Sequence, residues 1–204
     1  MCIRDRNNVD FFDSVAELWD EINTYNVEAI NHIIDKAGIG PDDVVLDCGT
    51  GTGVLIPYIV EKITENGWVD AYDMSTEMLK VAHRKFSSTE KARFILGNIE
   101  RDRLFGAYDR IMMFCMLPHL DDPVATVARL YEGNLMPGGR IVIAFPSSKE
   151  EINSIHHERQ HNHVHSHFLV SADELADDLR HAGLNVDYVE DNDSCYIVRV
   201  AKPQ

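Results

Sequence analysis

The clearest chemical signal in this sequence is a glycine-rich segment framed by two acidic residues. Asp47 closes a short apolar run and opens the stretch D-C-G-T-G-T-G, which leads into a predicted helix. Gly49, Gly51 and Gly53 let the backbone bend sharply and approach a ligand, and the helix offers unpaired N–H groups. Asp73 closes the next predicted strand, where a carboxylate can accept both hydroxyls of a ribose. This combination predicts a nucleotide-type ligand at the carboxyl edge of a sheet.

The spacing of the glycines distinguishes between classes of nucleotide site. A dinucleotide fingerprint requires G-x-G-x-x-G, but its third position falls on Val54 when counted from Gly49 and on Ile56 when counted from Gly51. No GK[ST] follows, which excludes a phosphate-gripping P-loop. Two alternatives remain beside the interpretation of a different nucleotide site: an NAD enzyme, and a structural turn with an exposed Asp73.

The elements that must position these residues alternate between strands and helices. Apolar runs predict seven strands, at about 44–46, 68–73, 92–97, 108–114, 140–145, 184–190 and 195–201. Helical periodicity predicts helices between them, at about 54–64, 76–86, 122–132, 149–160 and 172–182. This alternation is typical of an α/β fold with a doubly wound, mostly parallel sheet. The tight turn at 191–193 favours an antiparallel hairpin at the end, so the last strand is expected to be antiparallel.

The length of 204 residues favours a single domain over 1–204. Residues 1–8 do not join the hydrophobic pattern and are interpreted as a non-native or disordered leader. Residues 9–37 predict a cap of two amphipathic helices, broken near 23–26. Residues 147–170 form a histidine-rich insertion between the fifth strand and the last helix, and this connection leaves from the ligand edge of the sheet.

Charge and composition restrict the partners. The formal net charge is -15, from 34 acidic and 19 basic side chains, so the surface should repel phosphate backbones and anionic membranes. We therefore expect a small-molecule substrate, no nucleic acid and no membrane. The sequence contains neither a membrane-spanning apolar run nor the apolar core of a secretory signal. Four scattered cysteines without a CxxC pair indicate a reducing cytoplasm.

With these motifs in place, the sequence resembles class I S-adenosylmethionine-dependent methyltransferases, especially the small-molecule branch that includes ubiquinone and menaquinone enzymes. The similar segments are VLDCGTGTGVL (45–55), AYDMSTEMLKVA (71–82), GNIE (97–100), YDRIMMFCMLPHLDDP (108–123) and LMPGGRIVIAF (135–145). The segment FFDSVAELWDE (11–21) is similar to the N-terminal cap of that branch. The resemblance covers about residues 11–145 and continues weakly to the end. It implies a Rossmann-like methyltransferase fold with S-adenosylmethionine as cofactor.

The resemblance also implies roles for individual residues. A loop would cradle the methionine part of the cofactor, and it consists of Asp47, Cys48, Gly49, Thr50, Gly51 and Gly53. Asp73 would hold the ribose, and Met74 would pack on the adenine.

Asn98 and Ile99 would border the adenine ring. Many relatives carry Asp at the position of Asn98, whose carbonyl can still accept a hydrogen bond from the adenine amino group. Cys115 would lie beside the methionine end. Trp19 and Phe12 would close over the cofactor, with packing inside the cap as the alternative.

The chemistry of methyl transfer needs few catalytic side chains. The protein has to align the acceptor atom with the methyl group and to exclude water. A base is needed only if the acceptor carries a proton. His119, which follows the fourth strand, has the best location for that base, and a structural role is the alternative. The motif NPPY of many nucleic-acid amino-methylating enzymes is missing, since the corresponding stretch reads FCML.

Six of the ten histidines lie in the segment HHERQHNHVHSH at 156–167. His157 and His161 are four residues apart on a predicted helix, so they could bind one ion together. Three more alternate and would share one side of an extended segment: His163, His165 and His167. Imidazole ligands suit zinc, nickel, copper or iron. We expect either a divalent transition metal or a metal-bearing substrate above the methyl donor, with a solvated polar loop as the alternative.

The main functional expectation is methyl transfer to a small-molecule acceptor, assisted by a metal at the histidine-rich segment. Two alternatives stay open: a metal-binding or sensory protein without turnover, and a protein or RNA methyltransferase with an open docking face. The glycine loop and Asp73 favour a protein that still uses its cofactor, although a fold alone does not establish catalysis.

Overall fold

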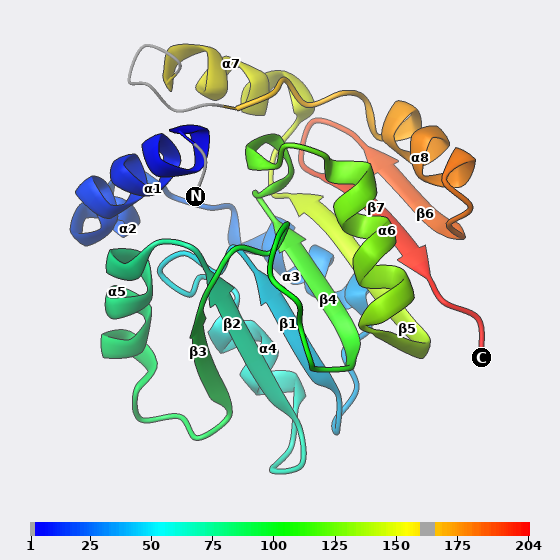
Figure 1. The fold of residues 1–204 in the computed structure, drawn as a ribbon, viewed down its shortest axis with the longest axis horizontal. Helices are drawn as coiled ribbons and strands as arrows, with labels where there is room; N and C mark the ends of the chain where they lie inside the picture. Colours follow the sequence, from blue (N-terminus) through cyan, green and yellow to red (C-terminus); the bar gives the residue numbers. More distant parts are fainter. Residues whose placement is uncertain (1–2, 160–165) are drawn as a thin grey trace.

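The computed structural model describes residues 3–159 and 166–204, and these form a seven-stranded sheet in the order β3-β2-β1-β4-β5-β7-β6 (Figure 1). The strands are β1 (Val44–Cys48), β2 (Trp68–Asp73), β3 (Ala92–Leu96), β4 (Tyr108–Phe114), β5 (Leu135–Phe145), β6 (Val186–Asp191) and β7 (Tyr196–Ala201). Neighbours from β3 to β5 pair in parallel, whereas β7 is antiparallel to both β5 and β6. The predicted fold class, including the antiparallel last strand, is confirmed.

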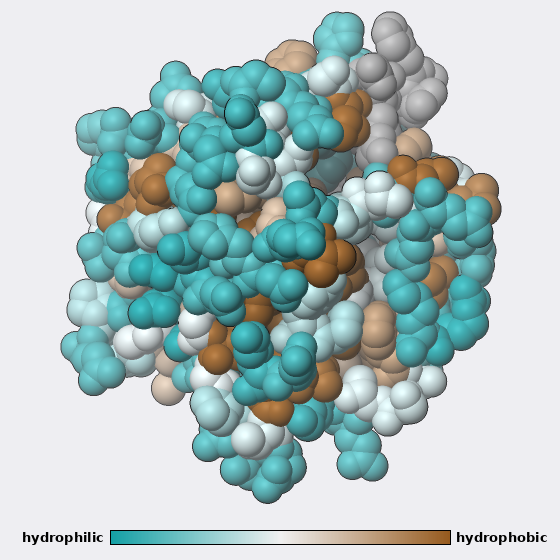
Figure 2. Space-filling model, turned by 180° about the vertical axis from the view of Figure 1, so that it is seen from behind, coloured by the Kyte–Doolittle hydropathy of each residue, from teal (hydrophilic) through white to brown (hydrophobic). Residues whose placement is uncertain are grey.

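Helices cover both faces of the sheet. They are α3 (Val27–Ala37), α4 (Ile56–Lys62), α5 (Thr76–Phe86), α6 (Pro123–Gly133) and α8 (Ala172–His181). Buried side chains of α3 and α4 pack on one face, and those of α6 and α8 pack on the other. The face of the molecule that lies behind the view of Figure 1 is mostly hydrophilic, with apolar side chains in separate patches (Figure 2). Among the described residues, no helix combines the length and the apolar character that crossing a bilayer requires.

Helix α3 shows how the local sequence defines an element. The side chain of Asn26 caps its N-terminus by accepting from the N–H of Ala29, and Gly38 ends it in the left-handed region with a φ of 62°. Ile30 and Ile34 are one turn apart and are buried against the sheet. Residues 27–37 were expected in the cap. Helix α3 packs on one face of the sheet instead, because its apolar stripe faces the strands.

The cap consists of α1 (Ile3–Val15), η1 (Ala16–Leu18) and α2 (Trp19–Ile22), which pack on α5. Helix α7 (Lys149–Arg159) extends over the carboxyl edge of the sheet, on the same side as α1 (Figure 1). Residues 3–8 of the predicted leader belong to α1, and Asn8 is buried. The interpretation of 1–8 as a non-native or disordered leader stays a prediction.

Two further boundaries depend on pairing between strands. Strand β5 begins before the strand predicted at 140–145, because Leu135 already pairs with Tyr108 and the register then shifts before Arg110 pairs with Arg140. Gly138, with a φ of 78°, allows that irregularity. The predicted hairpin at 191–193 is confirmed by the antiparallel pairing of β6 with β7.

Candidate functional site

A cavity of about 210 Å³ lies at the carboxyl edge of the sheet. Its walls come from the ends of β1, β2 and β4, from the cap and from α7. The arrowheads of β1, β4 and β5 point toward this side in Figure 1, with α1 and α7 beyond them. Strand β1 has β2 on one side and β4 on the other, so the cavity lies at the point where the strand order reverses. Doubly wound folds bind their ligands at this point.

The loop after β1 presents its backbone to the cavity. Gly49, Gly51 and Gly53 have φ values of 70°, 55° and 86°, in the left-handed region that favours glycine. Gly49, Thr50 and Gly51 line the cavity. A Cβ atom on Gly51 would meet no protein atom within 4 Å, so this backbone borders open space. The loop therefore fits a ligand that approaches the main chain closely.

Asp73, at the end of β2, lines the cavity and is tied to this loop. Its Oδ2 accepts a hydrogen bond from the N–H of Gly51 at 2.8 Å, and its Oδ1 accepts one from the N–H of Ser75 at 2.8 Å. Burial raises the pKa of the Asp73 carboxyl above its usual value, although these N–H donors act in the opposite direction. An ionised carboxylate has about four lone-pair sites, so the side chain can also accept a hydroxyl group of a ligand.

Three residues predicted to bind the cofactor lie behind the cavity wall. Asp47 is 1% exposed and accepts the hydroxyl of Thr50 at 2.7 Å, and burial raises its pKa to about 7. Cys48 is fully buried in the core, which raises the pKa of its thiol. A Cβ on Gly53 would lie 2.8 Å from the ring of Phe86. These three residues therefore support the loop from behind the cavity wall, and their direct contact with the cofactor stays a prediction.

Met74, Asn98 and Ile99, predicted to surround the adenine, all line the cavity. The N–H of Asn98 donates to Asp102 Oδ2 at 2.7 Å, and its side-chain Oδ1 accepts the N–H of Glu100 at 2.9 Å. The amide oxygen predicted to meet an adenine amino group is thus already bonded once. A ligand would have to use its second lone pair.

Cys115 directly follows β4 and lines the cavity, and its place beside the methionine end stays a prediction. Its φ of 53° makes it the single non-glycine residue with a positive φ in the described part of the chain. Such a backbone costs energy and occurs preferentially at functional sites. Burial raises the pKa of the Cys115 thiol well above its usual range, so the side chain stays protonated and contributes a soft apolar surface.

Four rings form another part of the wall. Phe12 and Trp19 from the cap lie edge to face with centroids 5.5 Å apart, and the ring of His119 lies 5.3 Å from Phe12. His156 of α7 lies 5.1 Å from His119. All four residues line the cavity, and the roles of Trp19 and His119 toward a ligand stay predictions. The imidazoles offer proton acceptors beside an otherwise aromatic surface.

Polar contacts fix the cap over the cavity. Asp13 Oδ1 accepts the hydroxyl of Ser75 at 2.5 Å, at the N-terminus of α5. Asp20 accepts the hydroxyl of Thr52 at 2.5 Å and an N–H of Lys85 at 2.6 Å. These contacts connect the cap with α5 and with the glycine loop, so the aromatic rings of the cap are held near the ligand.

The histidine-rich segment contributes to the cavity through a residue that the sequence prediction did not select. His156 is buried and lines the cavity, whereas His157 and His167 are exposed. The predictions for three other residues lie outside the described part of the chain: His161, His163 and His165. Within residues 3–159 and 166–204, the single group with metal-ligand spacing is His32, Glu190 and Cys195, which does not belong to this segment.

Further cavity residues were not selected from the sequence, and several come from distant segments. They include Asn8, Asn23, Tyr25, Phe114, Met116, Phe145, Ile152 and Ile155, together with His156. A local signal existed for α7 alone, because Ile152, Ile155 and His156 follow the three-and-four spacing of one buried helical face. No pattern in the sequence indicated Asn8 or Tyr25.

Comparison with known proteins identifies the family. Residues 18–189 match the model of a protein family that is described as "Methyltransferase domain". Malonyl-[acyl-carrier protein] O-methyltransferase from Marinomonas sp. is 27% identical over 181 residues, 86% of this chain and 65% of that protein. A tRNA (adenine(57)-N(1)/adenine(58)-N(1))-methyltransferase from Methanocaldococcus jannaschii is 30% identical over 89 residues, 42% of this chain and 32% of that protein. The chain thus spans less than two thirds of the length of these relatives.

A solved structure shares the fold over nearly the whole chain. It is the methyltransferase in a complex with the Trm112 methyltransferase activator from Haloferax volcanii, with a TM-score of 0.76 and 20% identity. The match covers 95% of this chain and 98% of that one.

Proposed function

The chain belongs to the methyltransferase domain family, in its class I S-adenosylmethionine-dependent group, and from this premise we propose that it transfers a methyl group from S-adenosylmethionine to a small-molecule acceptor. One observation carries the proposal: the carboxylate of Asp73 and the bare backbone of Gly51 meet at one wall of the cavity, while two imidazoles stand at another.

We propose that the cofactor lies along the wall formed by the ends of β1 and β2. Asp73 accepts the ribose hydroxyls there, and the loop from Gly49 to Gly51 lies against the methionine part. Met74 and Ile99 enclose the adenine, and Cys115 borders the methionine end. When bound, S-adenosylmethionine supplies an electrophilic methyl group. The residues of the chain then have to orient the acceptor and exclude water.

We place the acceptor among the rings of Phe12, Trp19, His119 and His156. Aromatic walls favour a flat or apolar acceptor, because they bury its surface. The imidazole of His119 is the proposed proton acceptor for a hydroxyl or an amine that carries a proton. His156, 5.1 Å away, is positioned to orient the His119 ring or to bind the acceptor beside it.

The charge of the chain favours a small molecule over RNA. A net charge of -15 opposes the counterion release that drives binding to a phosphate backbone. One relative is named as a tRNA methyltransferase, so similarity alone does not exclude nucleic acid as the acceptor. The Haloferax volcanii methyltransferase forms a complex with an activator protein, so binding of a protein partner by this chain also requires a test.

A protein without turnover is the alternative function. The relatives are named as enzymes, which does not favour it. Metal assistance through the histidine-rich segment remains a prediction, and it is separable from methyl transfer by experiment.

The test is incubation of the purified protein with methyl-labelled S-adenosylmethionine and a metabolite extract, with and without added divalent metal. We expect label in a small-molecule product. Label in added tRNA alone would contradict the acceptor class. Cofactor binding by calorimetry without any labelled product would support the alternative without turnover. A requirement for metal that is lost when the histidines of the histidine-rich segment are replaced would support the assisting role of that segment.

A further inference from the structure

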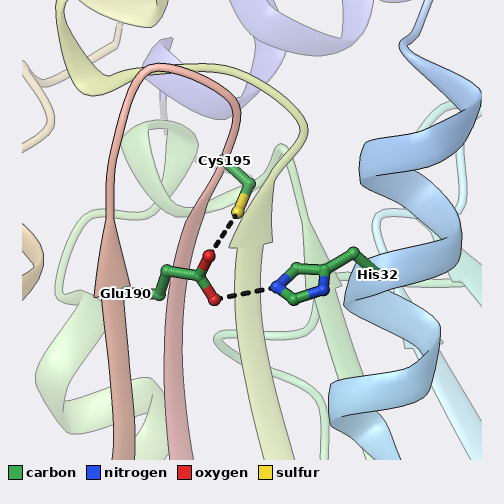
Figure 3. Close-up of side chains that lie close together, drawn as sticks. All are labelled: His32, Glu190 and Cys195. Carbon is green, nitrogen blue, oxygen red and sulfur yellow. Dashed lines mark hydrogen bonds and ion pairs between the residues drawn. The ribbon is translucent and has the colours of Figure 1, made fainter.

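A second group of chemically competent side chains lies outside the cofactor cavity. His32 from α3, Glu190 from β6 and Cys195 from the turn before β7 converge, as Figure 3 shows. His32 Nε2 lies 2.9 Å from Glu190 Oε2, and Cys195 Sγ lies 3.4 Å from Glu190 Oε1. One nitrogen, one oxygen and one sulfur atom thus lie within 4.8 Å of one another.

The distances suit a single metal ion among these atoms. Zinc binds nitrogen and oxygen at about 2.0–2.2 Å and sulfur at about 2.3 Å, so neighbouring ligand atoms of a tetrahedral site are about 3.5 Å apart. Two of the observed separations are 2.9 and 3.4 Å and all lie within 4.8 Å, so small side-chain rotations would bring the three atoms to such spacings. Zinc binds all three of these ligand types, the histidine nitrogen, the carboxylate oxygen and the cysteine sulfur.

The surroundings allow an ion to enter and to be held. The side chain of His32 is 40% exposed and that of Glu190 is 21% exposed, whereas Cys195 is 2% exposed. The three residues line a surface hollow with Asn192 and Asp193 of the hairpin turn. Ions can therefore reach the outer ligands, and the thiol closes the inner side.

The Glu190 carboxylate is oriented by its neighbours. It accepts hydrogen bonds from the hydroxyl of Tyr188 and from the side-chain amide of Asn192, and it lies beside the ring of His32. Burial and the nearby Glu190 raise the pKa of the Cys195 thiol to about 11, so the thiol is protonated without a metal.

We propose that His32, Glu190 and Cys195 bind a divalent transition metal ion, zinc in the first place, with a fourth position left to water or to Asp193. Binding forms bonds from the metal to His32 Nε2, a carboxylate oxygen of Glu190 and Cys195 Sγ. The thiol proton is released to solvent, and the imidazole proton moves to Nδ1, which frees the lone pair of Nε2. No oxidation or reduction takes place.

Such an ion would join two elements that the chain connects only over a long distance. Helix α3 and the β6–β7 hairpin would share a metal at the carboxyl side of β6. The same hollow includes Asn26, the N-cap of α3, and Tyr25 immediately before it lines the cofactor cavity. The metal would thus stabilise the segment from which the cap leaves the sheet.

The test uses cobalt as a spectroscopic probe for zinc. Because the histidine-rich segment can also bind metal, the experiment starts from an untagged full-length variant in which five histidines are replaced by glutamine: His157, His161, His163, His165 and His167. Titration with Co²⁺ is expected to give one bound ion per chain. A thiolate-to-cobalt charge-transfer absorption should appear and should disappear when Zn²⁺ is added.

Matched substitutions assign the ligands in that background. Cys195→Ser and His32→Ala are expected to remove the charge-transfer band or to weaken cobalt binding, whereas Cys115→Ser and His181→Ala keep the band. Melting curves with Zn²⁺ and with a chelator should show a metal-dependent rise in the starting variant that Cys195→Ser lacks. Absence of a thiolate band in a folded starting variant, or a band that persists in Cys195→Ser, would overturn the proposal.

Discussion

Asp73 Oδ2 accepts a hydrogen bond from the backbone N–H of Gly51 at 2.8 Å, so the strand-end carboxylate and the glycine loop form one unit. The bond fixes the acid at the end of β2 against the loop that follows β1. It explains why a carboxylate and a bare backbone are found at the same wall of the cavity. Their joint position makes the pocket a specific site rather than a gap between strands.

Replacing Asp73 by alanine is expected to weaken binding of S-adenosylmethionine by about 1–3 kcal/mol, or about 5- to 150-fold, because charged hydrogen bonds to the ribose are lost. Isothermal titration calorimetry measures the change. Asp191→Ala is the matched control, since Asp191 also ends a strand but accepts the N–H of Ala172 away from the cavity. Equal affinities of Asp73→Ala and the wild type would refute the ribose assignment.

Substitution of Gly51 or Gly53 by alanine should separate effects on cofactor affinity from effects on the stability of the fold. Each position carries a left-handed backbone cost of about 1–2 kcal/mol. Gly51→Ala is expected to lose cofactor affinity, since its Cβ enters open space at the cavity. Gly53→Ala should lower the melting temperature further, because its Cβ would lie 2.8 Å from the ring of Phe86.

Gly183→Ala provides the control for this pair, with a φ of 86° and no atom within 4 Å of the added Cβ. It should match Gly51→Ala in melting temperature and the wild type in affinity. Gly51→Ala with wild-type affinity would place the ligand elsewhere.

His119→Gln is expected to lower kcat by about 10²- to 10⁴-fold for an acceptor that carries a proton, because glutamine cannot take it up. Affinity for S-adenosylmethionine should stay near that of the wild type, since the ring faces the acceptor side. Initial rates with labelled cofactor check the first part, and calorimetry checks the second. His181→Gln, on the exposed end of α8, serves as control. A wild-type rate in His119→Gln would leave the ring as a packing partner of Phe12.

The buried carboxyl of Asp47 predicts a pH-dependent stability. Burial raises its folded pKa to about 7, while the unfolded chain ionises near the ordinary value of about 3.9. Between these values the folded state binds more protons than the unfolded state, so stability falls as pH rises and levels off above about 7. Asp47→Asn stays neutral and can still accept the hydroxyl of Thr50.

Melting temperatures measured from about pH 4 to about pH 8, a window that includes both pKa values, test the direction of this pH dependence. The variant should gain stability relative to the wild type as pH rises across that window. Asp178→Asn, on the exposed face of α8, controls for the loss of one negative charge. A constant difference between wild type and Asp47→Asn would mean that Asp47 is ionised throughout.

Elements with local signals could be predicted from the sequence. The bounds of β2, α5 and β4 match the expectation, because an apolar run or the cap at Ser75 defines each end. The start of β5 could not be predicted, since it depends on pairing between Leu135 and Tyr108 across a bulge. The helix at 27–37 was recognised, but its amphipathic pattern did not reveal that the sheet is its partner.

The residues of the candidate site also divide into those with a local signal in the sequence and those that depend on distant contacts. The loop at Gly49 and Gly51 and the acid at Asp73 follow from their positions at the ends of neighbouring strands. The positions of Asp47 and Gly53 behind the cavity wall did not follow, because a motif does not tell which of its members border a cavity. His156 and the group of His32, Glu190 and Cys195 depend on contacts between distant segments.

The most direct test of the account is a crystal structure of the protein with S-adenosylmethionine bound. We expect the ribose hydroxyls within hydrogen-bond distance of Asp73 and the adenine between Met74 and Ile99. The methionine part should lie along Gly49 to Gly51. An adenosyl group in any other place, or no bound ligand at a concentration that saturates the protein in calorimetry, would contradict the account.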